Sequence, residues 1–96
     1  LSSAASDVYK RQYLGLIAAL EYCVENKVNN VRIFLDSLLV VQQVNMEYKV
    51  KSKKLQTHYE KSLKLIDQIE DIEIHHIRRE FNSRADQLAN EALDEI

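Results

Sequence analysis

The chain has 96 residues, enough for one small domain and too few for two, since domains typically run to about 100 to 150 residues. Apolar residues make up 46% and charged residues 29%, which is a globular composition. The formal net charge of −2 excludes a global electrostatic attraction to nucleic acid or to a membrane surface. Any surface that binds a polyanion must therefore be local.

Cysteine and glycine usage narrows the class of protein further. A single cysteine, Cys23, excludes an internal disulfide framework and a cysteine-rich zinc site, and its apolar helical surroundings favour a buried thiol over a nucleophile. The longest apolar run, residues 14–20, is far shorter than the roughly 20 residues of a membrane span, and the start of the chain lacks a signal-peptide layout. We therefore expect a cytoplasmic protein with no membrane partner. One glycine and no proline are unusual for a complete α/β domain and indicate missing sequence.

The first half of the chain carries three patterns of regular structure. Apolar residues from Tyr13 recur at three- and four-residue steps, which predicts a helix over about residues 10 to 27. Residues 31–35 (VRIFL) are β-branched, aromatic and nearly all apolar, which is typical of a central strand covered on both faces. Helical spacing then predicts a short helix over residues 37 to 44, with Asp36 in the N-cap position.

The second half continues this alternation. Residues 45 to 54 show no clear period and form a basic loop, and a second amphipathic helix is expected over residues 55 to 69. Residues 72–77 alternate in polarity, which indicates a strand with one wetter face at the edge of a sheet. An apolar stripe predicts a terminal helix from about residue 82 to Ile96. Because helices separate the two strands, they should pair in parallel through a right-handed crossover, giving an α/β fold.

Two carboxylates follow the strands at the end where parallel sheets bind ligands. Asp36 comes directly after the first strand, and Asp86 lies in the first turn of the last helix, which begins at the same sheet end. Their convergence suggests a hard divalent cation. Each has a structural alternative, because Asp36 is placed to cap one helix and Ser83-x-x-Asp86 fits a capping box. The two roles are compatible, since a capping carboxylate can also face a ligand.

Basic residues gather in two places that suit phosphate. Arg78 and Arg79 end the second strand, where a solvated pair is the simpler interpretation. Residues 49–64 hold six lysines against one acid, Glu60, which fits either a surface that neutralises backbone phosphates or a solubilising face. The adjacent His75 and His76 point to opposite faces of their strand, which argues against a shared metal site.

Four segments of the chain form a recognisable set: residues 13–21 (YLGLIAALE), 31–44 (VRIFLDSLLVVQQV), 48–51 (YKVK) and 76–90 (HIRREFNSRADQLAN). The Asp-Ser pair after a buried strand is weak alone, but it is joined to an R-E-x-N-x-x-A-D-x-L-A-N run about 40 residues later, and together they are specific. These segments resemble the C-terminal two-thirds of a type 1 ribonuclease H domain, and the resemblance covers residues 13 to 96.

The resemblance implies a hydrolase that cuts the RNA strand of an RNA–DNA hybrid through divalent ions, Mg²⁺ or Mn²⁺, held by four carboxylates. It implies that Asp36 and Asp86 are the third and fourth of these carboxylates, both catalytic and metal-binding. We assign contacts with the hybrid to Lys49, Lys51, Lys53, Lys54, Arg78, Arg79 and Asn82.

The chain departs from the family pattern in its N-terminal part. The strand that bears the first Asp is absent with its hairpin partners, so the fold is a partial one, and Gln12 stands where the family has a Glu. Residues 1–12 do not resemble the family, and we interpret them as a vector-like run joined to the genuine domain at residues 13–96. The loop after the second strand carries Glu80 and no histidine, so a histidine that assists product release is not implied.

The sequence thus predicts a ribonuclease H fragment whose parent cleaves hybrid with Mg²⁺ and needs no obligate protein partner. The fragment itself should be inactive, because it has two of the four carboxylates. Two alternatives remain, a non-catalytic nucleic-acid-binding module of the same fold and a structural or protein-interaction domain. An Asp and a Glu encoded upstream of Tyr13 would favour the enzyme.

Overall fold

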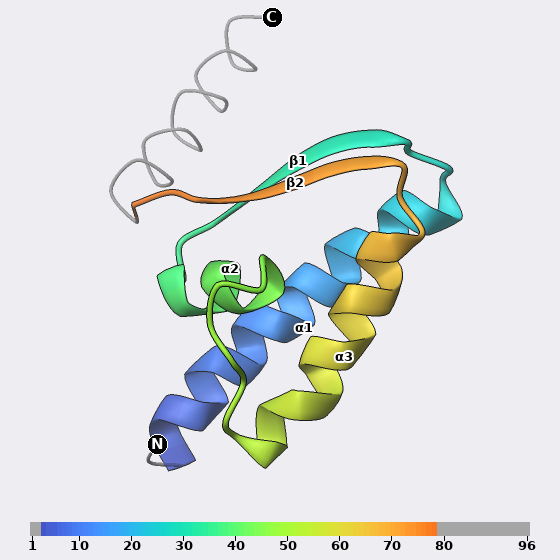
Figure 1. The fold of residues 1–96 in the computed structure, drawn as a ribbon. Coiled ribbons are helices and arrows are strands. Elements are labelled where there is room, and N and C mark those ends of the chain that lie inside the picture. The colour runs from blue at the N-terminus through green and yellow to red at the C-terminus, as the bar shows by residue number, and fades with distance from the viewer. Residues whose placement is uncertain (1–2, 79–96) are drawn as a thin grey trace, which may run out of the picture.

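Three helices and a two-stranded sheet form the part of the chain described by this computed structural model, residues 3–78 (Figure 1). The elements are α1 (Ser3–Glu25), β1 (Asn30–Leu35), α2 (Leu38–Val44), α3 (Lys53–Asp67) and β2 (Asp71–His76). The order is the one expected from the sequence as far as β2. The expected terminal helix lies outside the described residues.

The two strands pair in parallel, as predicted. The register runs from Asn30 opposite Asp71 to Leu35 opposite His76. The ladder continues one residue further, because the Ile77 N–H donates to the Leu35 carbonyl oxygen at 2.9 Å. Each strand begins one residue earlier than the sequence pattern indicated, and α2 and α3 form the connection between them.

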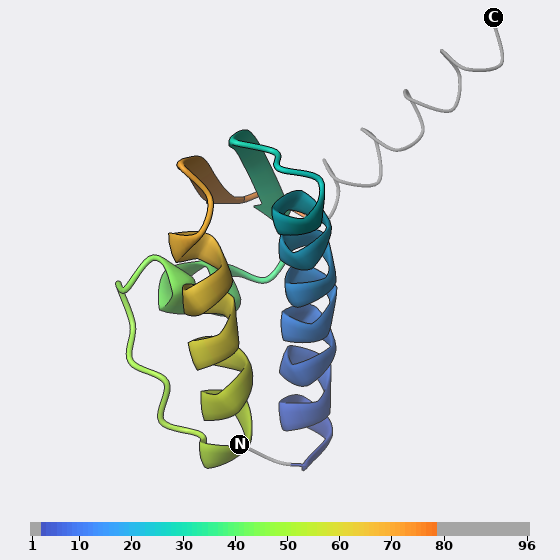
Figure 2. The same ribbon diagram turned by 90° about the vertical axis from the view of Figure 1, so that its right-hand side faces the viewer.

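The sheet is covered on one face among the described residues, which corrects the expectation that β1 is covered on both. Exposure alternates along β1: Val31, Ile33 and Leu35 are half-buried, whereas Arg32 and Phe34 are exposed. Helices α1 and α3 lie side by side on the same side of the sheet (Figure 2). The apolar character of Phe34 concealed this alternation in the sequence.

Helix α1 begins at Ser3, seven residues before the start that we expected. The segment before Gly15 contains neither glycine nor proline, so nothing in it stops a helix from propagating toward the N-terminus. Its other end closes at Lys27, which has a left-handed φ of 55°, while the Val28 N–H donates to the Cys23 carbonyl at 2.9 Å. The proposed junction between residues 12 and 13 falls within α1 and stays a prediction.

The core lies between the helices and the inner face of the sheet. Its fully buried side chains come from all three helices and include Tyr13, Leu16, Leu20, Val40 and Leu55. Cys23 is 7% exposed and reduced, which confirms the prediction of a buried thiol. None of the helices described here is long and apolar enough to cross a membrane.

Candidate metal and nucleic-acid-binding site

Asp36 lies where β1 ends, one residue beyond the last pair of the ladder. It is half-buried and lines a cavity of about 370 Å³ together with residues from α1 and from the start of α2. The lining comprises Val8, Tyr9, Gln12, Asp36, Ser37, Leu38 and Leu39. The carboxylate therefore sits at the sheet end predicted from the sequence.

Ser37, and not Asp36, caps helix α2, which corrects the expectation from the sequence. The Val40 N–H donates to the Ser37 Oγ at 3.4 Å, and Ser37 has extended backbone angles, φ −97° and ψ 104°. The helix begins at Leu38, one residue later than predicted, which moves the cap by one position. Asp36 interacts with other groups of the protein, but it is not needed to cap α2.

Gln12 of α1 lines the same cavity as Asp36. The resemblance placed a family Glu at this position, so the structure brings together the two positions where the family has carboxylates. The side chain here is a neutral amide, which supplies no negative charge to a cation. Positions 12 and 36 are far apart in the sequence, and only the fold brings them to the same cavity.

The carboxylates of the described residues do not form a metal-binding cluster. No group of three His, Cys, Asp or Glu side chains lies close enough within residues 3–78 to hold a metal. Asp36 is the one carboxylate in the lining of its cavity. Asp86 falls outside the described residues, so the predicted approach of Asp36 and Asp86 stays a prediction.

Four of the assigned lysines gather around a second cavity, of about 610 Å³, between α2 and the start of α3. Lys49 and Lys51 belong to the connecting loop, and Lys53 and Lys54 to the first turn of α3; all four are exposed. No acidic residue lines this cavity. Two cations in a first helical turn oppose the helix dipole by about 0.3 to 1 kcal/mol each, so helix stability does not explain them.

The lysine-rich segment is not uniform in its contacts. Lys61, further along α3, lies 3.5 Å from Glu21 Oε1 of α1 and links the two helices, while Lys64 is exposed in the last turn of α3. Arg78 is exposed just beyond β2, at the same end of the sheet as Asp36. Arg79 and Asn82 lie outside the described residues.

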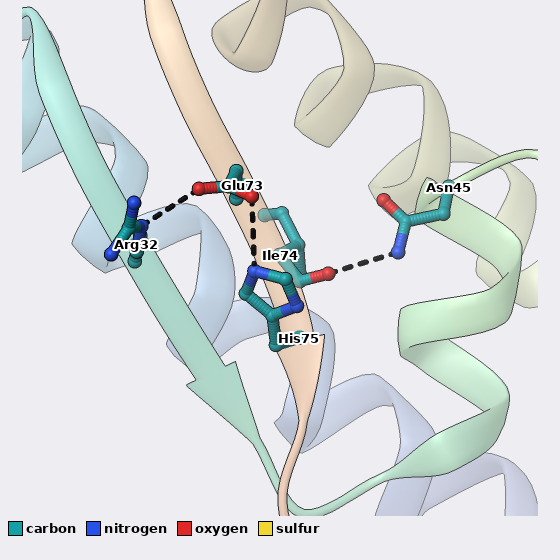
Figure 3. A network of polar contacts seen from close by, with 5 residues as sticks. All are labelled: Arg32, Asn45, Glu73, Ile74 and His75. Carbon is teal, nitrogen blue, oxygen red and sulfur yellow. Dashed lines mark hydrogen bonds and ion pairs between the residues drawn. The ribbon is translucent and has the colours of Figure 1, made fainter.

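The outer face of the sheet carries a polar network that the sequence analysis did not identify (Figure 3). The Arg32 Nε donates to Glu73 Oε2 at 2.7 Å, His75 Nε2 lies 3.4 Å from Glu73 Oε1, and the rings of His75 and Phe34 stack at 5.6 Å. The hydrogen bond from Arg32, followed by its charge, lowers the pKa of Glu73. Register was the missing information, because it places Arg32 opposite Glu73 and Phe34 opposite His75.

Comparisons with known proteins identify the family to which the fold belongs. The sequence profile of the family described as reverse transcriptase-like matches residues 3–92. The chain is 36% identical over 83 residues to the bifunctional protein Rv2228c of Mycobacterium tuberculosis, and 34% identical over 84 residues to the ribonuclease HI of Halobacterium salinarum. These matches cover 86% and 88% of the chain.

Two solved structures are similar to the fold. The N-terminal RNase H domain of Rv2228c, solved as a fusion with maltose-binding protein, matches 86% of the chain with a TM-score of 0.71 and 36% identity. RNase H1 of Halobacterium salinarum matches 88% with a TM-score of 0.69 and 34% identity.

The chain spans only part of these relatives: 23% and 42% of the two curated proteins, and 60% and 64% of the two solved chains. The likeness at this coverage confirms the expected partial ribonuclease H fold with two parallel strands. The chain belongs to the reverse transcriptase-like family of ribonuclease H-like domains.

Proposed function

We propose that this chain binds RNA–DNA hybrid and belongs to a protein that hydrolyses the RNA strand of that hybrid. The observation that carries the proposal is the group of four lysines at residues 49–54, which lies on one surface of a ribonuclease H-like fold. Phosphate binding by lysine needs no metal and no base contact. The described residues are therefore sufficient for the first step, which is binding of the hybrid.

Cleavage in the parent protein would depend on Mg²⁺ or Mn²⁺, for which Asp36 and Asp86 are the proposed ligands. Divalent ions of this kind stabilise the attacking and leaving oxygens of a phosphoryl transfer. In this chain Gln12 lines the same cavity as Asp36, and its amide does not add the negative charge of a carboxylate. We therefore propose that the chain as written binds hybrid without cleaving it at a useful rate.

The second candidate is a non-catalytic module that binds hybrid with the same surface. Gln12 is the observation that favours it, because the residue removes one family carboxylate from the cavity that holds Asp36. Both candidates share the binding step and differ in the chemistry of the parent. We also propose a reducing, cytoplasmic location, consistent with the buried and unpaired Cys23, and action without an obligate protein partner.

The binding step is tested by fluorescence anisotropy with a labelled RNA–DNA hybrid between about 50 and 200 mM salt. The affinity should fall as salt rises, and the triple substitution Lys51→Gln, Lys53→Gln and Lys54→Gln should weaken binding and lower the salt slope by up to about 3. Lys64→Gln is the matched control, since Lys64 lies on α3 but does not line the lysine-rich cavity. Equal affinity of the triple variant and the wild type would refute the assignment of hybrid binding to these lysines.

A further inference from the structure

The lysine-rich cavity has an apolar floor as well as a basic rim. Leu55 is 1% exposed and Leu39 is half-buried, and Tyr48 lines the same cavity. Phosphates on the outside of a duplex need no such floor. A volume of about 610 Å³ falls within the range of sites that enclose small ligands, about 300 to 1,000 Å³.

Gln43 supplies a nearly buried hydrogen-bond donor to this cavity. The residue is 4% exposed and lines the cavity, and its Oε1 accepts a hydrogen bond of 2.6 Å from the Tyr13 hydroxyl. Burial, with a smaller contribution from Tyr59, raises the pKa of Tyr13, so the hydroxyl keeps its proton and Oε1 stays the acceptor. The Gln43 Nε2 has no hydrogen-bond partner within residues 3–78, and no fully buried side-chain atom there is unpaired, so Nε2 keeps some solvent access in a residue that lines the cavity.

The start of α3 adds further donors at the rim. Ser52 occupies the N-cap position, but its hydroxyl makes no capping hydrogen bond, and the first turn contains no acidic residue. The N-terminal end of a helix favours anions. Cations, amide donors and an apolar floor thus meet in one cavity whose lining has no negative charge.

We propose that this cavity binds a single unpaired nucleoside phosphate. The phosphate lies at the lysines and the start of α3, the base stacks on Tyr48 over Leu39 and Leu55, and the Gln43 amide donates to an acceptor of the base. The nucleotide is either free in solution or the unpaired end of a nucleic-acid strand. This goes beyond the proposed function, because contacts with a hybrid duplex use the lysines without entering the cavity.

The test is a titration of the 96-residue chain with adenosine monophosphate, followed by two-dimensional ¹H–¹⁵N NMR. We expect saturable binding with shifts at Gln43, Tyr48 and Ser52. Ser52→Asp provides a better helix cap, so this variant should fold. It also places a negative charge at the rim of the cavity, which should weaken the binding of adenosine monophosphate at least tenfold. Tyr48→Leu changes a side chain that is 57% exposed and should weaken binding severalfold without unfolding the chain. Lys64→Gln, outside the cavity, should change the affinity less than twofold.

No saturable binding, or equal affinity of Ser52→Asp and the wild type, would overturn the proposal. A second series compares a blunt hybrid with a hybrid that has a 5′-phosphorylated single-stranded overhang. Tighter binding of the overhang, with adenosine monophosphate as a competitor, identifies the strand end as the ligand; equal binding with saturable adenosine monophosphate identifies the free nucleotide. A blunt hybrid that binds while adenosine monophosphate does not would leave the proposed function standing and refute this inference alone.

Discussion

At the residue scale, the neighbouring side chains of Asp36 and Ser37 at the end of β1 have different roles. Ser37 caps α2, and Asp36 lines the cavity that Gln12 also lines. A residue whose side chain must cap a helix is restricted in direction. The cap of α2 therefore does not depend on the Asp36 carboxylate.

Replacement of the cap should reveal this division. Ser37→Ala removes the acceptor of the Val40 N–H, and we expect a loss of about 1 kcal/mol in the free energy of unfolding, measured by urea denaturation. Ser52→Ala is the matched control, because Ser52 occupies the N-cap position of α3 without a side-chain hydrogen bond, so its loss should be much smaller. Equal effects of the two substitutions would show that the Ser37 hydroxyl does not act as a cap.

The Arg32–Glu73 pair should give a measurable pH dependence. Arg32 lowers the pKa of Glu73 in the folded state, so this carboxylate stabilises the fold above its ordinary pKa, and that contribution is lost as the pH falls through the lowered value. Arg32→Gln should raise the pKa of Glu73 toward its ordinary value, as followed by ¹³C NMR of the carboxyl carbon. Arg11→Gln, an exposed arginine on α1, should leave it unchanged; an unmoved pKa in Arg32→Gln would contradict the ion pair.

At the element scale, a buried hydrogen bond joins α1 to α2. Tyr13 and Gln43 are 0% and 4% exposed, and their side chains meet at 2.6 Å. Tyr13→Phe removes the donor and leaves the Gln43 Oε1 buried without its partner, which should cost about 1 to 3 kcal/mol in urea unfolding. The double variant Tyr13→Phe, Gln43→Leu should recover part of this loss. A neutral Tyr13→Phe would refute the assignment.

Local sequence patterns predicted which helices and strands form better than they predicted where those elements begin and end or which side chains they bring together. The strands and helices α2 and α3 follow from period-2 and period-3.6 apolar spacing, and parallel pairing follows from the helical connection. The early start of α1 could not be read from apolar spacing, because its first residues depend on helix propensity and not on an apolar stripe. The cavity that Gln12 shares with Asp36 and the position of Gln43 at the lysine-rich cavity depend on how the elements pack, which no local pattern contains.

At the scale of the whole molecule, the two edges of the sheet differ. The Asn45 side chain at the end of α2 donates to the Ile74 carbonyl at 2.9 Å and so covers part of the outer edge of β2 (Figure 3). On β1 the alternation of the ladder directs the main-chain groups of Arg32 and Phe34 away from β2, and within the described residues no strand pairs with them. Phe34 is also 52% exposed. An open edge with an exposed aromatic residue favours association.

We expect the isolated chain to associate as its concentration rises, since an open strand edge pairs with other chains and a two-stranded sheet is marginal even with helices on it. Sedimentation velocity should show larger species as concentration rises, and Phe34→Lys should reduce them because a charge beside the open edge opposes pairing. Leu14→Lys, at an exposed apolar residue of α1 that lines neither cavity, is the control and should change association less. A monomer at all concentrations with a sharp thermal transition would contradict this prediction.

The most direct test of the proposed function is a cleavage assay on a labelled RNA–DNA hybrid with Mg²⁺. The chain as written should bind the hybrid and cut it at no useful rate, and Gln12→Glu alone should restore little. Replacement of residues 1–12 by a family-like N-terminal region with both missing acids should give Mg²⁺-dependent cleavage, which Asp36→Asn or Asp86→Asn then abolishes. Robust metal-dependent cleavage by the unmodified chain, or a rebuilt chain indifferent to both Asp substitutions, would contradict the account.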